Sequence, residues 1–100
     1  MPEFLYKLQL VRGDMLRNGP TEHEKSVVAE HFAYLQNLTA KGVVIFVGRT
    51  DTTGEDTMGL AVFRAESEDR AREIMNDDPA VKKGLMKATL YPFKVVLQGK

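Results

Sequence analysis

Apolar side chains alternate with other residues near the start of the chain. From position 4 onward every second residue is apolar, which produces the series Phe4, Tyr6, Leu8 and Leu10. A period of two places these side chains on one face of an extended strand, so we predict a strand with one face on a core. The next segment, 12–20, has turn-forming residues at both ends and no clear period, which indicates a loop.

After this loop, apolar residues recur at the spacing of an α-helix. Thr21 can cap a helix, and Glu24 three residues later completes the spacing of a capping box. Gly42 supplies a left-handed stop, so we expect the helix to cover 22–41. The side chains expected to face inward recur at intervals of three and four residues, and they are Val28, His31, Phe32, Leu35 and Leu38.

The rest of the chain predicts two strands, a second helix and a last strand. The run at 43–47 is apolar without alternation, which is typical of a central strand covered on both faces, and a polar hairpin loop leads to a third strand at about 58–65. A helix over 68–78 follows, and then a strand over 88–97 in which Pro92 indicates an edge position or a bulge. Ser67 is expected to cap the second helix, and Pro79 to end it. The side chains of this helix expected to face the core are Ala71, Ile74 and Met75.

The predicted order of elements is that of the ferredoxin-like βαββαβ fold, an α+β architecture. Both helices would pack on one face of a four-stranded antiparallel sheet, in a single domain that spans residues 1–100. The other face would be bare, although Leu5, Val11 and part of 43–47 make it apolar. A second copy of the chain is the simplest cover, so we predict a homodimer that forms through this face.

Composition narrows the classes of partner and chemistry. Fourteen Lys and Arg balance fourteen Asp and Glu, so no net positive charge favours nucleic acid. No apolar stretch is long enough for a membrane, and the first residues do not have the pattern of a secretory signal. The chain has no cysteine, which excludes thiol chemistry and fits the cytoplasm, where we expect the protein. No nucleotide-binding fingerprint is present, so no cofactor is expected.

Two positions are candidates for chemistry. His31 lies on the apolar face of the first helix, where it is either a core histidine satisfied by a backbone carbonyl or a group that transfers protons; position alone favours the former. His23 lies among charged residues and is expected on the surface, and the two histidines lack metal-binding spacing, so no metal is predicted. Asp77 and Asp78 stand at the unfavourable end of a helix dipole, but aspartate before proline is also a common helix stop.

Three segments together resemble the YciI-like family. They are EHFAYLQNLTAKG in the first helix, DPAVKKGL in the turn after the second helix and YPFKVV in the last strand, and the resemblance extends over about 4–97. It implies a ferredoxin-like fold, a dimer whose sheets face each other, and an active site centred on a histidine and an aspartate. His31 matches the histidine, and Asp78 is the best match for the aspartate. A few family members act on chlorinated hydroquinone-type substrates, whereas most have no assigned reaction.

One departure from the family concerns the turn after the second strand, where many members have a Gly-Gly-Pro-like sequence. Here Gly48 is followed by Arg49 and Thr50, which we expect at the pocket entrance as substrate-binding residues. A guanidinium offers paired donors to an anionic or phenolic oxygen, although a solvated arginine in a polar hairpin is an equal alternative. Tyr34 is a further candidate for the pocket, but a place on the flank of the helix is the simpler expectation.

The leading hypothesis is a small enzyme in which His31 is a general acid or base and Asp78 orients its ring. Such a pair suits lyase or isomerase chemistry on a small aromatic or anionic molecule. The alternative is a dimeric module that binds such a molecule without changing it. A third interpretation is similarity to the dimeric α/β-barrel monooxygenases that need no cofactor; it shares the fold, but no residue is specifically marked for it.

Overall fold

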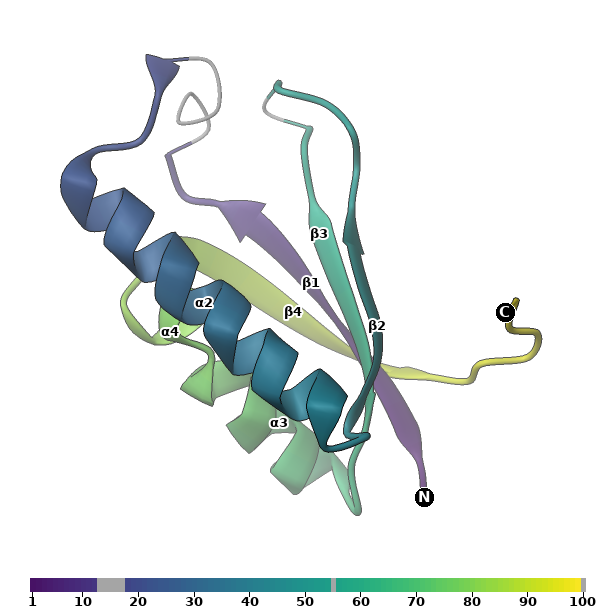
Figure 1. Cartoon of the computed structure of the whole chain (residues 1–100). Coiled ribbons are helices and arrows are strands. Elements are labelled where there is room, and N and C mark those ends of the chain that lie inside the picture. Colours follow the sequence, from purple (N-terminus) through teal and green to yellow (C-terminus); the bar gives the residue numbers. More distant parts are fainter. Residues whose placement is uncertain (13–17, 55, 100) are drawn as a thin grey trace.

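The computed structural model describes residues 1–12, 18–54 and 56–99 (Figure 1). Apart from one additional short helix, the order of the described elements is the predicted one. The predicted loop at 12–20 has its centre outside the described residues. The elements are β1 (Glu3–Leu10), α2 (Glu22–Ala40), β2 (Val44–Arg49), β3 (Gly59–Arg64), α3 (Glu68–Asp77), α4 (Pro79–Lys82) and β4 (Met86–Phe93).

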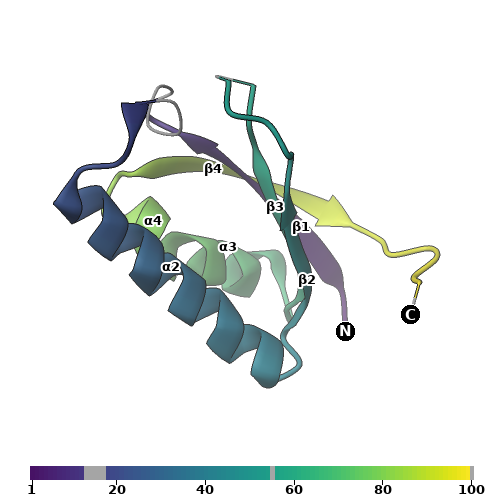
Figure 2. The same cartoon turned by 45° about the horizontal axis from the view of Figure 1, so that its top comes forward.

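The four described strands form one antiparallel sheet in the order β2-β3-β1-β4. β1 therefore lies between β3 and β4, as in the ferredoxin-like fold. The described helices all lie against one face of the sheet and leave the opposite face uncovered (Figures 1 and 2). The predicted α+β architecture is confirmed. Of the helices in the described ranges, none is both long enough and apolar enough to cross a bilayer.

The core lies between the helices and the inner face of the sheet. β1 contributes Phe4, Tyr6 and Leu8, which are at most 5% exposed, as the alternation predicted. On β3, Phe63 lies opposite Phe4, and its ring meets that of Tyr6 edge to face at a centroid distance of 5.6 Å. The buried residues of α3 are the three predicted ones, Ala71, Ile74 and Met75.

Local interactions determine where α2 begins and ends. Thr21 Oγ1 accepts a hydrogen bond from the Glu24 amide at 3.1 Å, and the Glu24 carboxylate accepts one from the Thr21 amide at 2.8 Å, so the predicted capping box is confirmed. Two nitrogens of the Arg12 guanidinium donate to the same carboxylate, at 2.6 and 3.0 Å. These hydrogen bonds lower the pKa of Glu24 to about 2. Gly42 has a φ of +77°, which confirms the predicted left-handed stop.

The inner face of α2 differs from the prediction at one aromatic position. Val27 and Leu35 are buried, but Phe32 is 62% exposed. Successive residues of a helix are rotated by about 100°, so Phe32 points well to one side of the line that runs through its neighbour His31. The expectation that Phe32 faces the core is therefore wrong, whereas Val27, which the pattern did not single out, is a core residue.

β2 is an edge strand, so the prediction of a central strand covered on both faces is wrong. Its Phe46 and Val47 are 47% and 45% exposed. The hairpin places β2 outside β3, because β1 already occupies the other side of β3. The apolar run has a different cause: Val47 lies opposite Ala61 of the inner face, whereas Phe46 lies opposite Val62 of the bare face.

β4 is the other edge strand, in agreement with Pro92. The strand ends at Phe93, which lies opposite Glu3, and does not continue to residue 97 as predicted. Because β1 begins at Glu3, the residues after Phe93 have no neighbouring strand with which to pair. Val96 and Leu97 are accordingly 79% and 92% exposed.

Candidate active site

Two side chains that are 47 residues apart in the sequence meet between the helices and the sheet. His31 extends from α2, and Asp78 lies at the junction of α3 and α4. The His31 Nδ1 atom is 2.7 Å from Asp78 Oδ1 and 2.9 Å from Asp78 Oδ2. The Asp78 side chain is completely buried, and the His31 side chain is 13% exposed. The structure therefore brings the two predicted catalytic residues into direct contact.

The position of Asp78 follows from local structure. Its amide donates to the Met75 carbonyl at the end of α3, and its carboxylate accepts a hydrogen bond from the Ala80 amide at 3.0 Å at the start of α4. Pro79 lies in the first turn of α4, where a missing amide proton costs nothing. Asp78 thus ends one helix and caps the next, and its side chain still binds two further groups.

These further contacts indicate where the protons of the pair lie. Asp78 Oδ2 accepts a hydrogen bond from the Tyr6 hydroxyl at 2.8 Å, and Oδ1 accepts from the Ala80 amide. A carboxylate that accepts from these two donors also accepts from His31, so Nδ1 carries the ring proton. In the neutral imidazole the proton-free nitrogen is then Nε2, on the side of the ring that faces away from Asp78.

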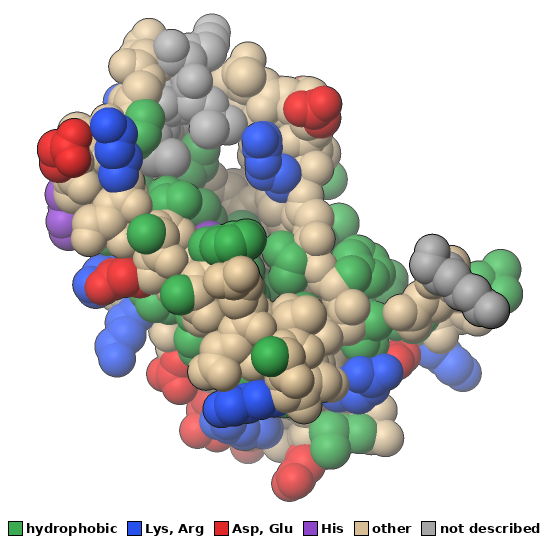
Figure 3. Space-filling model, in the orientation of Figure 1, with side chains coloured by type: hydrophobic (Ala, Val, Ile, Leu, Met, Phe, Trp, Pro, Cys, Tyr) green, Lys and Arg blue, Asp and Glu red, His purple; other side chains and the backbone are tan. Residues whose placement is uncertain are grey.

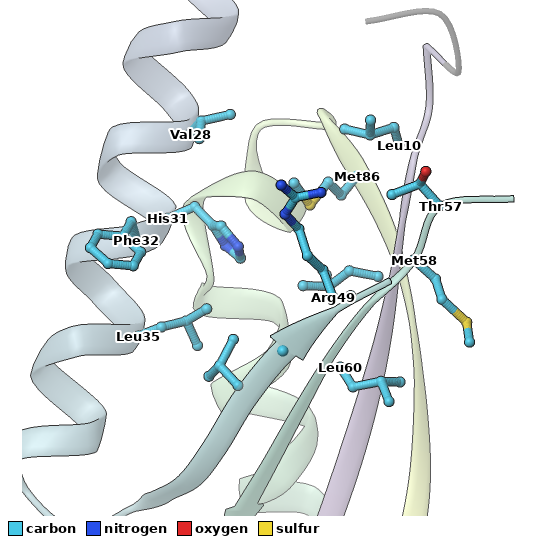
Figure 4. Close-up of a pocket in the computed structure, with 14 residues that line it drawn as sticks. Leu10, Val28, His31, Phe32, Leu35, Arg49, Thr57, Met58, Leu60 and Met86 are labelled. Atoms are coloured by element: carbon cyan, nitrogen blue, oxygen red, sulfur yellow. The ribbon is translucent and has the colours of Figure 1, made fainter. Parts of the chain in front are cut away.

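A cavity of about 490 Å³ adjoins the imidazole, between α2, β1 and the hairpin of β2 and β3. His31 and Arg49 extend towards this space from different sides (Figure 4). Figure 3 shows the molecule hollowed in this region, with hydrophobic side chains around the hollow. In the described part of the chain, no three His, Asp or Glu side chains are grouped so that they could hold a metal ion. The largely apolar wall includes Leu8, Val28, Leu35, Val47 and Met86.

Of the predicted substrate-binding residues, Arg49 lines the cavity and Thr50 does not. The Arg49 guanidinium donates to the Thr50 carbonyl at 3.4 Å, which is long for a hydrogen bond, so a ligand oxygen could readily replace this contact. The Thr50 hydroxyl oxygen instead accepts a hydrogen bond from the Met58 amide at 3.0 Å. Thr50 therefore stabilises the hairpin that carries Arg49.

Tyr34 also lies outside the cavity lining. Its hydroxyl donates to the Ile74 carbonyl at 2.7 Å and joins α2 to α3. Burial, together with the negative charges of Asp77 and Asp78, raises the pKa of Tyr34 to about 12. On the helix, Tyr34 is rotated from His31 in the direction opposite to Phe32, which does line the cavity. The simpler expectation, a place on the helix flank, agrees with this geometry.

Tyr6 and Thr57 also lie at or beside the site, although neither belongs to a motif of the sequence that predicts one. Tyr6 was assigned only to the core, although a buried tyrosine hydroxyl normally has a hydrogen-bond partner, and this rule could have marked it. Thr57 is 8% exposed, lines the cavity, and forms a hydrogen bond with Thr52 at 2.7 Å between the hydroxyl oxygens. Nothing in the sequence distinguishes Thr57 from the other threonines of the hairpin loop.

Known structures and family models connect this geometry to other proteins. The chain is similar to 5-chloro-2-hydroxyhydroquinone dehydrochlorinase (TftG) from Burkholderia phenoliruptrix AC1100, solved in complex with 2,5-dihydroxybenzoquinone. The identity is 27%, the TM-score is 0.67, and the match covers 92% of this chain and 93% of that chain.

Two further solved structures are more distant. A dimeric ferredoxin-like protein from an uncultured marine organism has 14% identity and a TM-score of 0.48, with 100% of this chain and 99% of that chain covered. SnoaB, a cofactor-independent oxygenase from Streptomyces nogalater, has the same identity and TM-score, with coverage of 98% and 97%. A search of curated proteins found no match. The model of the YCII-related domain matches residues 9–94, and the chain therefore belongs to the family of YCII-related domains.

Proposed function

We propose that this protein is a small enzyme in which His31 transfers a proton to or from a molecule bound in the cavity. The observation that carries the proposal is the buried Asp78 carboxylate, which binds one edge of an imidazole that adjoins the cavity. In this arrangement Nε2 of His31 accepts or returns the proton, while Asp78 holds the ring and balances the charge of the imidazolium. Such a pair suits an elimination or an isomerisation, in which a base removes a proton and its conjugate acid returns one.

The wall of the cavity indicates the class of substrate. A volume of about 490 Å³ lies within the usual range for small-molecule sites, and the wall is mainly apolar, which suits an aromatic ring. Arg49 would bind a phenolate or carboxylate oxygen of that ring. TftG supports this class, because it is named as a dehydrochlorinase of a hydroxyhydroquinone and was solved with a benzoquinone. We therefore propose a small aromatic substrate with an anionic or phenolic oxygen.

A binding module without catalysis is the second candidate. The observation in its favour is that every Asp78 contact also serves the structure: the carboxylate caps α4 and satisfies the buried hydroxyl of Tyr6 on β1. On this account His31 would be one more donor to a structural aspartate, and the cavity would hold a ligand that leaves unchanged.

A thermal-shift screen of small phenols and lactones, followed by NMR of the compounds that stabilise the protein, separates the two candidates. We expect at least one such compound to be converted by the wild type and by His23→Ala, whose histidine is exposed on the same helix. The variant His31→Ala should bind the compound without converting it. Binding without conversion by the wild type favours the module, and conversion by His31→Ala at the wild-type rate refutes the proposed role.

Arg49→Met tests the assignment of the anionic subsite with the same compounds. The variant should weaken the binding of phenolates and carboxylates by about tenfold, because a charge-assisted hydrogen bond is lost. Neutral analogues of the same shape should bind as before. Equal weakening of both groups would show that Arg49 only shapes the wall.

We also propose that two copies of the chain associate through the bare face of the sheet. On this face Leu5 lies opposite Tyr91, and no described helix covers them. Phe46 and Tyr91 are 47% and 43% exposed, and a second copy would cover them. At micromolar concentration, sedimentation equilibrium should show a dimer for the wild type and for Phe32→Arg, a change on the helical side, but the 11.2 kDa monomer for Phe46→Arg. A monomeric wild type would refute the proposal.

A further inference from the structure

The hydroxyl of Tyr6 is a buried polar group that the proposed proton transfer does not itself use. Tyr6 belongs to β1, is completely buried, and is absent from the cavity lining. Its hydroxyl lies 2.8 Å from Asp78 Oδ2, the oxygen that is also 2.9 Å from His31 Nδ1. Tyr6 therefore cannot touch a molecule in the cavity. It does, however, bind the same acceptor atom, Asp78 Oδ2, as His31, which lines the cavity.

The hydroxyl of Tyr6 holds its proton and donates it in a hydrogen bond to Asp78. Burial, followed by the negative charge of Asp78, raises the pKa of Tyr6 far above its ordinary value. The Tyr6 hydroxyl donates to Asp78 Oδ2 and so draws part of the negative charge of the carboxylate away from the imidazole. This hydrogen bond thereby reduces the attraction of the carboxylate for a second proton on the His31 ring.

We propose that Tyr6 is a positioning residue that acts through Asp78 and sets the proton affinity of His31. It holds Asp78 Oδ2 against Nδ1, so that the neutral ring presents a proton-free Nε2 to the cavity, and it prevents Asp78 from binding the proton of His31 too tightly. The consequence for catalysis rests on the proposed function, whereas the effect on the titration of His31 does not depend on turnover.

Tyr6→Phe alters none of the other charged or titratable side chains around the pair. Arg49 stands on the cavity wall, and a Glu30 to Lys83 ion pair at 2.6 Å joins α2 to the segment after α4. Asp77 is the last residue of α3, and Tyr34 of α2 donates its hydroxyl proton to the Ile74 carbonyl of α3. A change that removes only the Tyr6 hydroxyl therefore isolates its contribution from those of Asp78, Arg49, Glu30, Lys83, Asp77 and Tyr34.

The test is an NMR titration of the His31 imidazole in the wild type, in Tyr6→Phe and in Tyr34→Phe. Without the Tyr6 hydroxyl the carboxylate binds the imidazolium more strongly, so the midpoint of the His31 titration should rise by about half to one pH unit, a roughly three- to tenfold gain in proton affinity. Tyr34→Phe removes a hydroxyl that donates to the Ile74 carbonyl and should leave the midpoint unchanged. His23, on the exposed start of α2, is the internal reference.

An unchanged His31 midpoint in folded Tyr6→Phe would overturn the inference, as would an equal shift in Tyr34→Phe. If Tyr6→Phe does not fold, the wild type decides: the Tyr6 hydroxyl proton, assigned by NMR through its contact with the ring protons of Tyr6, must give a downfield signal that is protected from exchange. Its absence would also overturn the inference.

Turnover, once a substrate is known, adds a second readout. The acid limb of the kcat/KM profile of Tyr6→Phe should move to higher pH by the same amount, with KM unchanged. If the midpoint shifts but no compound is converted, the proposed function fails and the inference stands. If His31→Ala abolishes conversion but Tyr6→Phe leaves the midpoint of the His31 titration unchanged, the proposed function stands and the inference about Tyr6 fails.

Discussion

Replacing Asp78 by alanine perturbs the structure where its buried polar contacts converge. The carboxylate accepts hydrogen bonds from the Tyr6 hydroxyl, the Ala80 amide and His31 Nδ1, at distances from 2.7 to 3.0 Å. Because Tyr6, Ala80 and Asp78 are all completely buried, water does not reach the Tyr6 and Ala80 donors in the native structure. Asp78→Ala should therefore leave two fully enclosed donors, on Tyr6 and Ala80, without a partner.

The expected loss follows from these two donors. Each buried donor without a partner costs about 1–3 kcal/mol, whereas the His31 ring adjoins the cavity and can bind water there. Loss of the cap of α4 is part of the Ala80 contribution. We expect Asp78→Ala to lower the free energy of unfolding by about 2–6 kcal/mol, a large share of the roughly 5–15 kcal/mol that stabilises a domain.

Urea unfolding followed by circular dichroism measures this loss, and the chain offers matched controls. Asp77→Ala changes the preceding, exposed carboxylate at the end of α3 and should stay within about 0.5 kcal/mol of the wild type. Asp78→Asn keeps one oxygen that can accept from the Ala80 amide, so it should fall between the wild type and Asp78→Ala.

Two results would refute this reasoning. Unfolding of Asp78→Ala within about 1 kcal/mol of the wild type would show that the buried contacts contribute little net stability. An equal loss in Asp77→Ala would show that the end of α3, and not the contacts of the Asp78 side chain, determines the effect.

Two further predictions concern the ends of α2. The Arg12 hydrogen bonds lower the pKa of Glu24 from 4.5 to about 2, so the stability that depends on this carboxylate is complete above pH 4.5 and is lost as the pH falls towards 2. In thermal melts, Glu24→Gln should be less stable than the wild type at pH 7, and the difference in melting temperature should disappear at low pH. The control Glu22→Gln should change little. A difference for Glu24→Gln that does not depend on pH would contradict the assignment. Gly42 has a φ of +77°, so Gly42→Ala should lose about 1 kcal/mol in urea unfolding, whereas Gly48→Ala, at ordinary φ and with nothing within 4 Å of an added Cβ, should not.

Local signals predicted most of the elements, because each depends on residues close together in the sequence. The capping box at Thr21 and the glycine stop at Gly42 act within one or two helical turns, and the alternation in β1 depends only on side-chain period. The same kind of signal was wrong for β2, where an apolar run could indicate a covered central strand or an edge strand on a bare apolar face. Strand order decides between these, and strand order is not a local property.

The candidate site shows the same limit. The sequence could nominate His31 and Asp78, but spacing could not show that they touch, and it favoured a core histidine and a helix stop. It also could not separate Arg49, which lines the cavity, from Thr50 and Tyr34, which do not. That separation depends on how α2 is rotated against the sheet and on which hairpin side chains face the cavity.

By itself, the sequence determined the helix ends, the inward residues of β1 and α3, and the βαββαβ order, because hydrogen bonds to near neighbours and side-chain period act over a few residues. Only the tertiary structure decided that Tyr6 and His31 both bind the Asp78 carboxylate beside a cavity. The physical reason is that a contact between residues far apart in the chain depends on the packing of whole helices on the sheet, which is the sum of many weak interactions and leaves no local pattern.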